Sequence, residues 1–198
     1  MRTLGYAVLG LLSREELSGY DLKRWMERPL GYFWSARHSQ IYPELARLEE
    51  EGLVTHTLVE QSGKPDKKVY RITAEGLEAL KEWVVQPPVS RSVRDELTLK
   101  AYSVWLADKE KAARLFREEG LSHEEQLAYY EDLRTWMEGE HEAEVRDPGS
   151  PWFAVYATLR RGIGFEKEYA GWCRWMADSV GRREIPEKRK KGAKSVGL

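Results

Sequence analysis

The 198-residue sequence is poor in the residues that build covalent, metal and membrane sites. Its one cysteine, Cys173, excludes an internal disulfide and a thiolate zinc site. The four histidines are scattered, with no pair at metal-ligand spacing, so we predict neither a metal nor a cofactor. No run of about 18 uncharged apolar residues occurs, so we predict no membrane span. The apolar stretch 1–12 lacks a small-residue cleavage site, and we expect a core helix in a cytoplasmic protein.

The signatures of an enzyme are also missing from the sequence. We find no nucleophile beside a base, no glycine loop for phosphate and no cluster of metal ligands, so we predict a protein that is not an enzyme. The formal net charge is −1, and residues 1–86 are not basic in sum, whereas DNA-binding domains usually are. If nucleic acid is the partner, positive charge must be concentrated locally.

Residues 39–51 predict a short helix that buries one narrow stripe. Ile41, Leu45 and Leu48 fall at helical spacing, and Gly52 can take the left-handed conformation that ends a helix. An ordinary amphipathic helix with its polar side in water has the same periodicity, so this stretch alone leaves the interpretation open. If the helix instead enters a DNA major groove, the predicted reading residues are His38, Ser39, Gln40, Tyr42, Pro43 and Arg47.

The neighbouring elements favour the DNA interpretation, because their order is that of a winged helix-turn-helix. Helices are predicted over 3–12, 18–26 and 73–85, the last with an inward stripe of Leu77, Leu80 and Val84. Residues 53–60 and 69–73 alternate like strands on either side of a polar tip, which predicts a hairpin wing. A solvated lysine loop has the same composition as the tip, and the preceding helix favours the wing. The predicted DNA contacts of the wing are Lys64, Lys67, Lys68, Tyr70 and Arg71.

Composition divides the chain into a DNA-binding part, a linker, a helical part and a tail. Two prolines in the linker bar both a helix and a central strand, and the last segment is strongly basic. The predicted bounds are 1–86 for the winged helix, 87–93 for the linker, 94–181 for a helical dimerisation and effector domain, and 182–198 for the basic tail.

Four helices are predicted in the second half. The first runs to about residue 107, Asp108 caps a second that ends at Gly120, and Ser122 opens a third with a capping box. Ser150, directly before a proline, caps a long fourth helix that carries two adjacent apolar stripes. One small domain cannot cover both stripes, so we expect a partner subunit. The predicted dimer interface is Trp152, Tyr156, Leu159, Ile163, Tyr169, Trp172 and Met176.

Eight tryptophans raise the question of an aromatic ligand. They could line a pocket for a small aromatic effector, although core and interface anchors are the commoner use of tryptophan. Cys173 has only Arg174 as a basic neighbour in the sequence and lies on an apolar helix face, so we expect an inert buried thiol rather than a sensor.

The segments IYPELARLEEEGLV and KVYRIT, together with LGYAVLGLLS and SGYDLKRWME, resemble the PadR family of bacterial transcriptional regulators. The resemblance covers nearly all of residues 1–86, and the second half is similar to the all-helical C-terminal domain of one branch of that family. It implies a homodimeric repressor on a palindromic operator, with release by a small molecule. The family's DNA-facing positions match Ser39, Gln40, Tyr42 and Pro43, with Lys68 and Tyr70 at the wing.

The sequence thus predicts a mainly α protein with a small β-hairpin, in which a winged helix-turn-helix precedes a helical dimerisation domain. Its predicted partners are double-stranded DNA, a second copy and a small aromatic effector. The alternative is a winged helix that serves as a protein–protein adaptor without reading DNA. The operator, the effector and the sign of regulation are not encoded in any pattern that we find.

Overall fold

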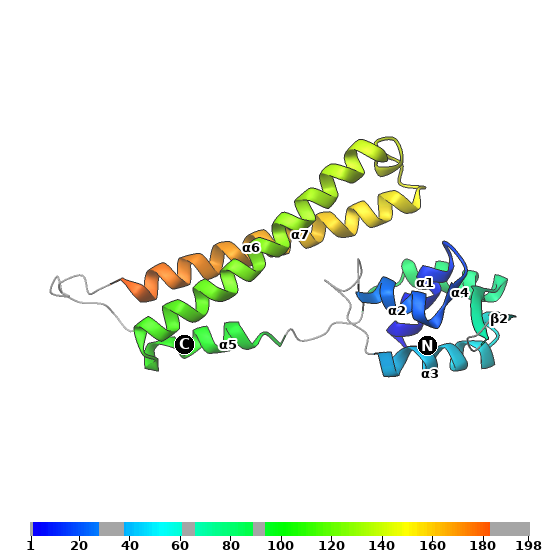
Figure 1. Ribbon diagram of the computed structural model, residues 1–198, viewed down its shortest axis with the longest axis horizontal. Coiled ribbons are helices and arrows are strands. Elements are labelled where there is room, and N and C mark those ends of the chain that lie inside the picture. The colour runs from blue at the N-terminus through cyan, green and yellow to red at the C-terminus, as the bar shows by residue number, and fades with distance from the viewer. Residues whose placement is uncertain (1, 28–37, 61–65, 89–93, 183–198) are drawn as a thin grey trace. The chain divides into compact units, whose positions relative to one another are not determined.

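The chain folds into two compact units, Met1–Ser92 and Val93–Leu198, seen in the computed structural model of Figure 1. The structure describes residues 2–27, 38–60, 66–88 and 94–182. The predicted wing residue Lys64, the side chain of His38 and all but the first residue of the basic tail lie outside this description.

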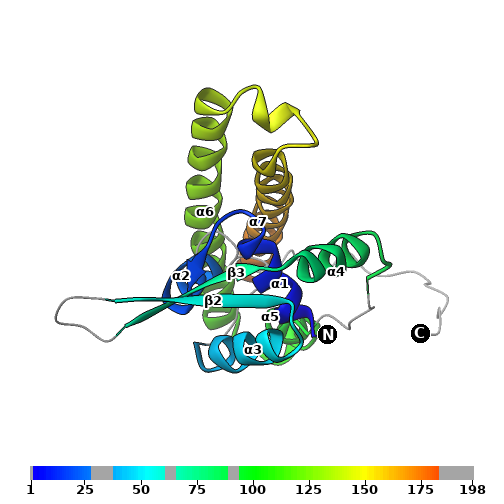
Figure 2. The same cartoon turned by 90° about the vertical axis from the view of Figure 1, so that its right-hand side faces the viewer.

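In its described residues, the first unit combines four helices with a three-stranded antiparallel sheet. Its hairpin is the predicted wing, and the strands of the hairpin pair from Val54 opposite Ile72 to Val59 opposite Lys67 (Figure 2). A two-residue strand that the sequence analysis did not predict pairs Leu17 with Tyr70, which gives the strand order β1-β3-β2. The elements are α1 (Thr3–Leu12), β1 (Leu17–Ser18), α2 (Gly19–Glu27), α3 (His38–Glu50), β2 (Val54–Val59), β3 (Lys67–Ile72) and α4 (Ala74–Val84).

Local hydrogen bonds set the ends of these helices where the sequence predicts them. Ser18 and Asp21 cap α2 reciprocally, since the backbone N–H of Asp21 donates to Ser18 Oγ at 3.2 Å and the backbone N–H of Ser18 donates to Asp21 Oδ2 at 3.2 Å. Gly52 has φ of 72° at the end of α3, where the N–H of the next residue donates to the carbonyl of Leu48 at 2.8 Å. Thr73 Oγ1 accepts from the N–H of Gly76 at 3.0 Å and caps α4.

One apolar core joins the helices to the sheet. Fully or almost fully buried residues from α1, α2, α3 and both long strands meet in it, among them Val8, Leu9, Leu22, Met26, Ile41, Leu45, Leu48, Val54 and Tyr70. The outer helix α4 is less buried than predicted. Leu80 packs partly against the core, but Val84 is 66% exposed and Leu77 is also exposed. A parallel stack of Tyr6 on Trp83, with ring centroids 4.4 Å apart, helps to join α4 to α1.

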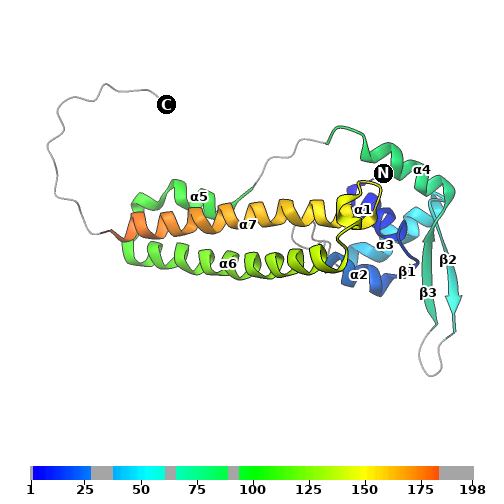
Figure 3. The ribbon, with the colours of Figure 1, turned by 90° about the horizontal axis from the view of Figure 1, so that it is seen from above.

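The second unit is dominated by two long helices that lie side by side (Figure 3). The N-caps predicted at Asp108 and Ser150 are present, with accepted hydrogen bonds of 2.9 Å and 3.1 Å. The predicted helix end at Gly120 is wrong, because the helix continues through it. The elements are α5 (Glu96–Tyr102), the 3₁₀ helix η2 (Val104–Leu106), α6 (Lys109–Glu140), the 3₁₀ helix η3 (Glu144–Arg146) and α7 (Pro151–Gly181).

Gly120 is a packing residue rather than a stop. A Cβ on Gly120 would lie 3.2 Å from the Cβ of Cys173, so the missing side chain lets α6 approach α7 closely. The helix gains enough from burying its face along α7 to run through a glycine and through the capping pattern at Ser122. Tertiary packing has overridden a local stop signal at Gly120 and a local start signal at Ser122.

Candidate nucleic-acid interface

The third helix, α3, presents the polar face that the sequence predicts. Its core stripe is completely buried, while Ser39, Gln40, Tyr42 and Pro43 are exposed near the N-terminal end. Pro43 lies inside the helix and has no N–H to donate to the preceding turn. Four of the six predicted reading residues therefore share one accessible surface, at the end of the helix that enters a major groove in helix-turn-helix proteins.

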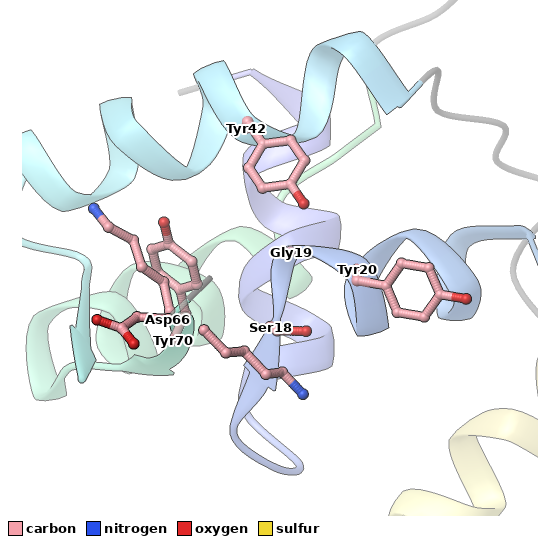
Figure 4. Close-up of a pocket in the computed structure, with 8 residues that line it drawn as sticks. Ser18, Gly19, Tyr20, Tyr42, Asp66 and Tyr70 are labelled. Atoms are coloured by element: carbon pink, nitrogen blue, oxygen red, sulfur yellow. The ribbon is translucent and has the colours of Figure 1, made fainter. Parts of the chain in front are cut away.

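Tyr42 is held by its contact with the start of α2. A Cβ on Gly19 would lie 2.5 Å from Cε1 of Tyr42, so only glycine leaves room for the ring there. In Figure 4 the ring of Tyr42 projects from α3 over Gly19. The side chain is still 46% exposed. A tyrosine that is positioned on one side and open on the other is suited to contact a ligand.

Arg47 differs from the prediction, because its guanidinium is already engaged on its own helix. It donates to Glu44 and, at 2.5 Å, to Glu51. Glu44 is only 4% exposed, and removing its partner would leave a nearly buried carboxylate unpaired. We therefore interpret Arg47 as a residue that neutralises the two glutamates of α3 rather than as a reader of bases.

The wing residues fall into three environments. Lys68 and Arg71 are exposed, as expected for contacts to phosphate. Lys67 forms an ion pair of 3.0 Å with Asp21 of α2. Tyr70 is 5% exposed and belongs to the core, where burial raises the pKa of its phenol. Among the predicted wing residues that the structure describes, Lys68 and Arg71 are therefore the ones with exposed side chains.

A hollow of about 460 Å³ lies between the start of α2, the exposed face of α3 and strand β3 (Figure 4). The sequence pattern predicts the segment Ser18-Gly19-Tyr20 only as the start of a helix and does not reveal its place in this surface. The only sequence signal was a tyrosine directly after a glycine at the start of the helix, and the structure shows that this Tyr20 is exposed. The lining residues are Ser18, Gly19, Tyr20, Tyr42, Asp66, Lys67, Lys68 and Tyr70.

Comparisons with known proteins decide the family. The chain is 39% identical over 177 residues to the negative transcriptional regulator PadR of Bacillus subtilis, which covers 87% of this chain and 94% of that protein. This chain belongs to the PadR-like family. Residues 8–82 match the transcriptional regulator PadR-like family, and residues 93–180 match the family called virulence activator alpha C-term.

Solved structures of the Bacillus subtilis PadR are similar to this PadR-like chain over most of its length. The complex of that protein with operator DNA matches with a TM-score of 0.76 at 36% identity, over 90% of this chain and 99% of the other. The complex with p-coumaric acid matches with a TM-score of 0.73 at 34% identity, over 92% and 97%. The winged-helix fold with a helical C-terminal region is thereby confirmed.

The residues predicted for the dimer interface of this PadR-like chain lie in two environments within the protomer. Leu159, Ile163 and Met176 are buried within the protomer itself, so a second copy could reach them only if the protomer opened. Tyr156 and Tyr169 are half-buried, and so are the tryptophans Trp152 and Trp172. The large apolar side chains that are exposed in the second unit include Leu99, Tyr102, Trp105, Leu106, Leu121, Tyr129, Trp136, Phe165 and Trp175.

Two of the polar pairs that join different elements of the second unit involve partly buried groups. His123 pairs with Glu166, the buried acid that interrupts the apolar stripe of α7. The hydroxyl of Tyr169 donates to Asp95 at 2.8 Å, at the N-cap of α5. Desolvation raises the pKa of the Tyr169 phenol, and burial raises that of Cys173 to about 11. A buried thiol whose pKa is raised in this way is a weak nucleophile at neutral pH.

Two further observations concern other classes of site. In the described part of the chain, no group of three or more histidine, cysteine, aspartate or glutamate residues could hold a metal ion. Within the same residues, no helix is long and apolar enough to cross a membrane.

Proposed function

We propose that this chain is a repressor that binds a palindromic DNA operator as a homodimer. The observation that carries the proposal is the likeness to a PadR crystallised with operator DNA, at 36% identity over 90% of this chain. The negative transcriptional regulator of Bacillus subtilis supports repression as the direction of the effect. The exposed end of α3 supplies hydrogen-bonding side chains for DNA bases, and the basic strand β3 supplies positive charge for phosphates.

In this proposal the N-terminal half of α3 reads base edges in the major groove. Gln40 is the reader of choice, because an amide can donate and accept two hydrogen bonds on adenine. Tyr42 and Ser39 flank it on the same exposed surface. Lys68 and Arg71 contact phosphates and fix the register without reading sequence.

We place the dimer contact on the exposed apolar side chains of the second unit rather than on the buried stripe of α7. Leu97, Ala101 and Val104 of α5 and η2 pack against the protomer's own core around Phe116. The other face of the same segment carries Tyr102 and Trp105, the latter 79% exposed. Such a concentration of exposed aromatic surface is typical of protein interfaces.

We further propose that a small aromatic acid lowers operator affinity. The support is the p-coumaric acid complex of a PadR that is 34% identical to this chain. An effector can shift the equilibrium only by its differential affinity for the free and the DNA-bound protein. Titration of the protein–DNA complex with p-coumaric acid and with benzoic acid tests this; unchanged DNA affinity at saturating concentrations of both would refute it.

We also propose that the chain acts by binding and has no enzymatic activity. It belongs to a family of transcriptional regulators. Turnover of any substrate by the purified protein in the absence of DNA would contradict this part of the proposal.

Selection of bound fragments from random-sequence DNA tests the proposed function. We expect an inverted repeat whose half-sites are separated by about one helical turn or a multiple of it. The reason is that a two-fold dimer places its two recognition helices in major grooves on the same side of the duplex. The Gln40→Ala variant should relax the preference at one position of each half-site. A protein that enriches no sequence, and whose DNA affinity is insensitive to salt, would favour the protein–protein adaptor instead.

A further inference from the structure

The start of α2 is tied to the stem of the wing through a single carboxylate. Oδ2 of Asp21 accepts from Ser18 Oγ at 2.6 Å and lies 3.0 Å from Nζ of Lys67. The strand pairing of Ser18 with Val69 runs beside this contact. The carboxylate therefore joins the first turn of α2, strand β1 and strand β3.

The ion pair between Asp21 and Lys67 should by itself weaken DNA binding. The Ser18 hydroxyl and then Lys67 hold the pKa of Asp21 below its usual range, so the side chain is ionised at neutral pH. A negative charge next to a surface that meets phosphates disfavours binding by like-charge repulsion. It also occupies Lys67, which could otherwise neutralise a phosphate. A residue with these two effects needs a compensating role in the same surface.

Lys68, the next residue along strand β3, differs from Lys67 in its exposure to solvent. Successive side chains of a strand point to opposite faces, and Lys67 is half-buried against α2 while Lys68 is exposed. The same first turn of α2 also carries Gly19, against which the ring of Tyr42 from α3 lies. The two sides of one turn thus contact the wing and the recognition helix.

We propose that Asp21 is a positioning residue for DNA binding, which holds Lys67 and thereby fixes the wing relative to α3. In this proposal Lys67 holds the wing in position and does not contact phosphate, whereas Lys68 contacts phosphate. The inference rests on the proposed function, because it assigns roles within the surface that binds DNA.

The test compares Asp21→Asn, Lys67→Met and the double variant with Lys68→Met as the matched control. Asparagine keeps an oxygen that accepts from Ser18, and methionine keeps the length of the lysine stem. The probes are a duplex with the site selected from random-sequence DNA and a scrambled duplex of the same composition. Affinity for both is measured over a range of salt concentrations, and thermal unfolding shows that each variant is folded.

We expect Asp21→Asn to weaken binding to the selected duplex, although it removes a negative charge from the DNA-binding surface. The ratio of selected to scrambled affinity should fall by about two- to fivefold, the range of a partly exposed ion pair. Lys67→Met should lower the ratio of selected to scrambled affinity by the same factor, without making binding less sensitive to salt. The double variant should lower this ratio no further than either single variant. Lys68→Met should weaken both duplexes alike and reduce the salt slope by about 0.9 per contact, or about 1.8 for a dimer.

Tighter binding of the selected duplex by Asp21→Asn would overturn the inference, as would a reduced salt slope for Lys67→Met or additive effects in the double variant. Failure of the proposed function looks different. In that case the wild-type protein would bind the two duplexes equally, and the tie would have no role in recognition.

Discussion

Replacing Gly19 by alanine should separate DNA binding from stability. The new Cβ would lie 2.5 Å from Cε1 and 2.9 Å from Cζ of Tyr42. Carbon atoms pack at about 3.5–4.0 Å, so the ring must move by about 1 Å. The ring is the far end of a flexible side chain and is 46% exposed, so it can swing outward without disturbing the core. The fold should therefore tolerate the change, whereas the position of Tyr42, which we propose contacts DNA, should not.

The expected loss of affinity follows from the contact that the ring makes. One hydrogen bond from the tyrosine hydroxyl is worth about 0.5–1.5 kcal/mol net, so losing it weakens binding between about twofold and about tenfold. The unfolding temperature of Gly19→Ala should stay about level, because Gly19 is the first residue of α2, outside the helix interior where alanine is clearly favoured over glycine. Tyr42→Ala sets the upper limit for the loss of affinity.

Two other glycines of the first unit serve as controls. A Cβ on Gly10, inside α1, would meet nothing within 4 Å, so Gly10→Ala should stabilise the fold by about 0.5–1 kcal/mol and leave DNA affinity unchanged. A Cβ on Gly76 would lie 2.1 Å from the carbonyl oxygen of Leu53. The backbone cannot move aside as a side chain can, so Gly76→Ala should lower the unfolding temperature markedly.

Circular dichroism melts and fluorescence anisotropy with the selected duplex measure both stability and DNA affinity for the four variants. The reasoning is refuted if Gly19→Ala binds the selected duplex as tightly as the wild type. It is also refuted if this variant loses stability as Gly76→Ala does, because something other than the tyrosine ring would then have moved.

Three further predictions concern the second unit. Gly120→Leu should cost about 1–3 kcal/mol through crowding at Cys173, whereas Gly139→Ala, with nothing within 4 Å, should stabilise; equal effects in chemical denaturation would contradict the close approach of α6 and α7. Cys173, with its pKa raised to about 11 by burial, should react with iodoacetamide at pH 8 only after unfolding in urea, and rapid labelling of the folded protein would refute this. The backbone N–H of Thr98, and then the Tyr169 hydroxyl, lower the pKa of Asp95. The stabilisation of the fold by Asp95 is therefore fully present above about pH 4, the pKa of an unfolded aspartate. It is lost as the pH falls through the lower pKa that Asp95 has in the folded protein. Asp95→Asn should be less stable at pH 7 and lose less on acidification, and parallel acid denaturation curves would contradict this.

The parts of the fold that the sequence predicted well depend on contacts within a few residues. The caps at Ser18, Thr73 and Ser150 each accept a hydrogen bond from a residue two or three positions later. Gly52 ends α3 through its own backbone conformation. Signals of this kind are complete in a short window of sequence, so no knowledge of the rest of the chain is needed.

The errors depend on residues far apart in the sequence. The strand at Leu17 exists because β3 pairs with it, and α6 continues through Gly120 because Cys173 lies opposite. The periodicity of α7 correctly marked Leu159 as buried, but it could not tell whether α6 or a second subunit covers that face. A hydrophobic stripe shows that a residue is covered and does not show what covers it.

The candidate site shows the same division. Exposure of Gln40 and Tyr42 followed from the helical period, because the core stripe leaves them on the other side. The pairing of Lys67 with Asp21 brings together residues 46 positions apart, and no local pattern announces it. The number of basic residues on the wing was therefore predictable, and the number available to DNA was not.

The affinity of the wild-type protein for the selected duplex and for its scrambled counterpart, measured between 50 and 200 mM salt, tests the central claim most directly. We expect the selected duplex to bind at least about a thousandfold more tightly, with both affinities falling as salt rises. Equal affinity for the two duplexes, or affinity that does not change with salt, would contradict the account that the face formed by α3 and the wing reads DNA.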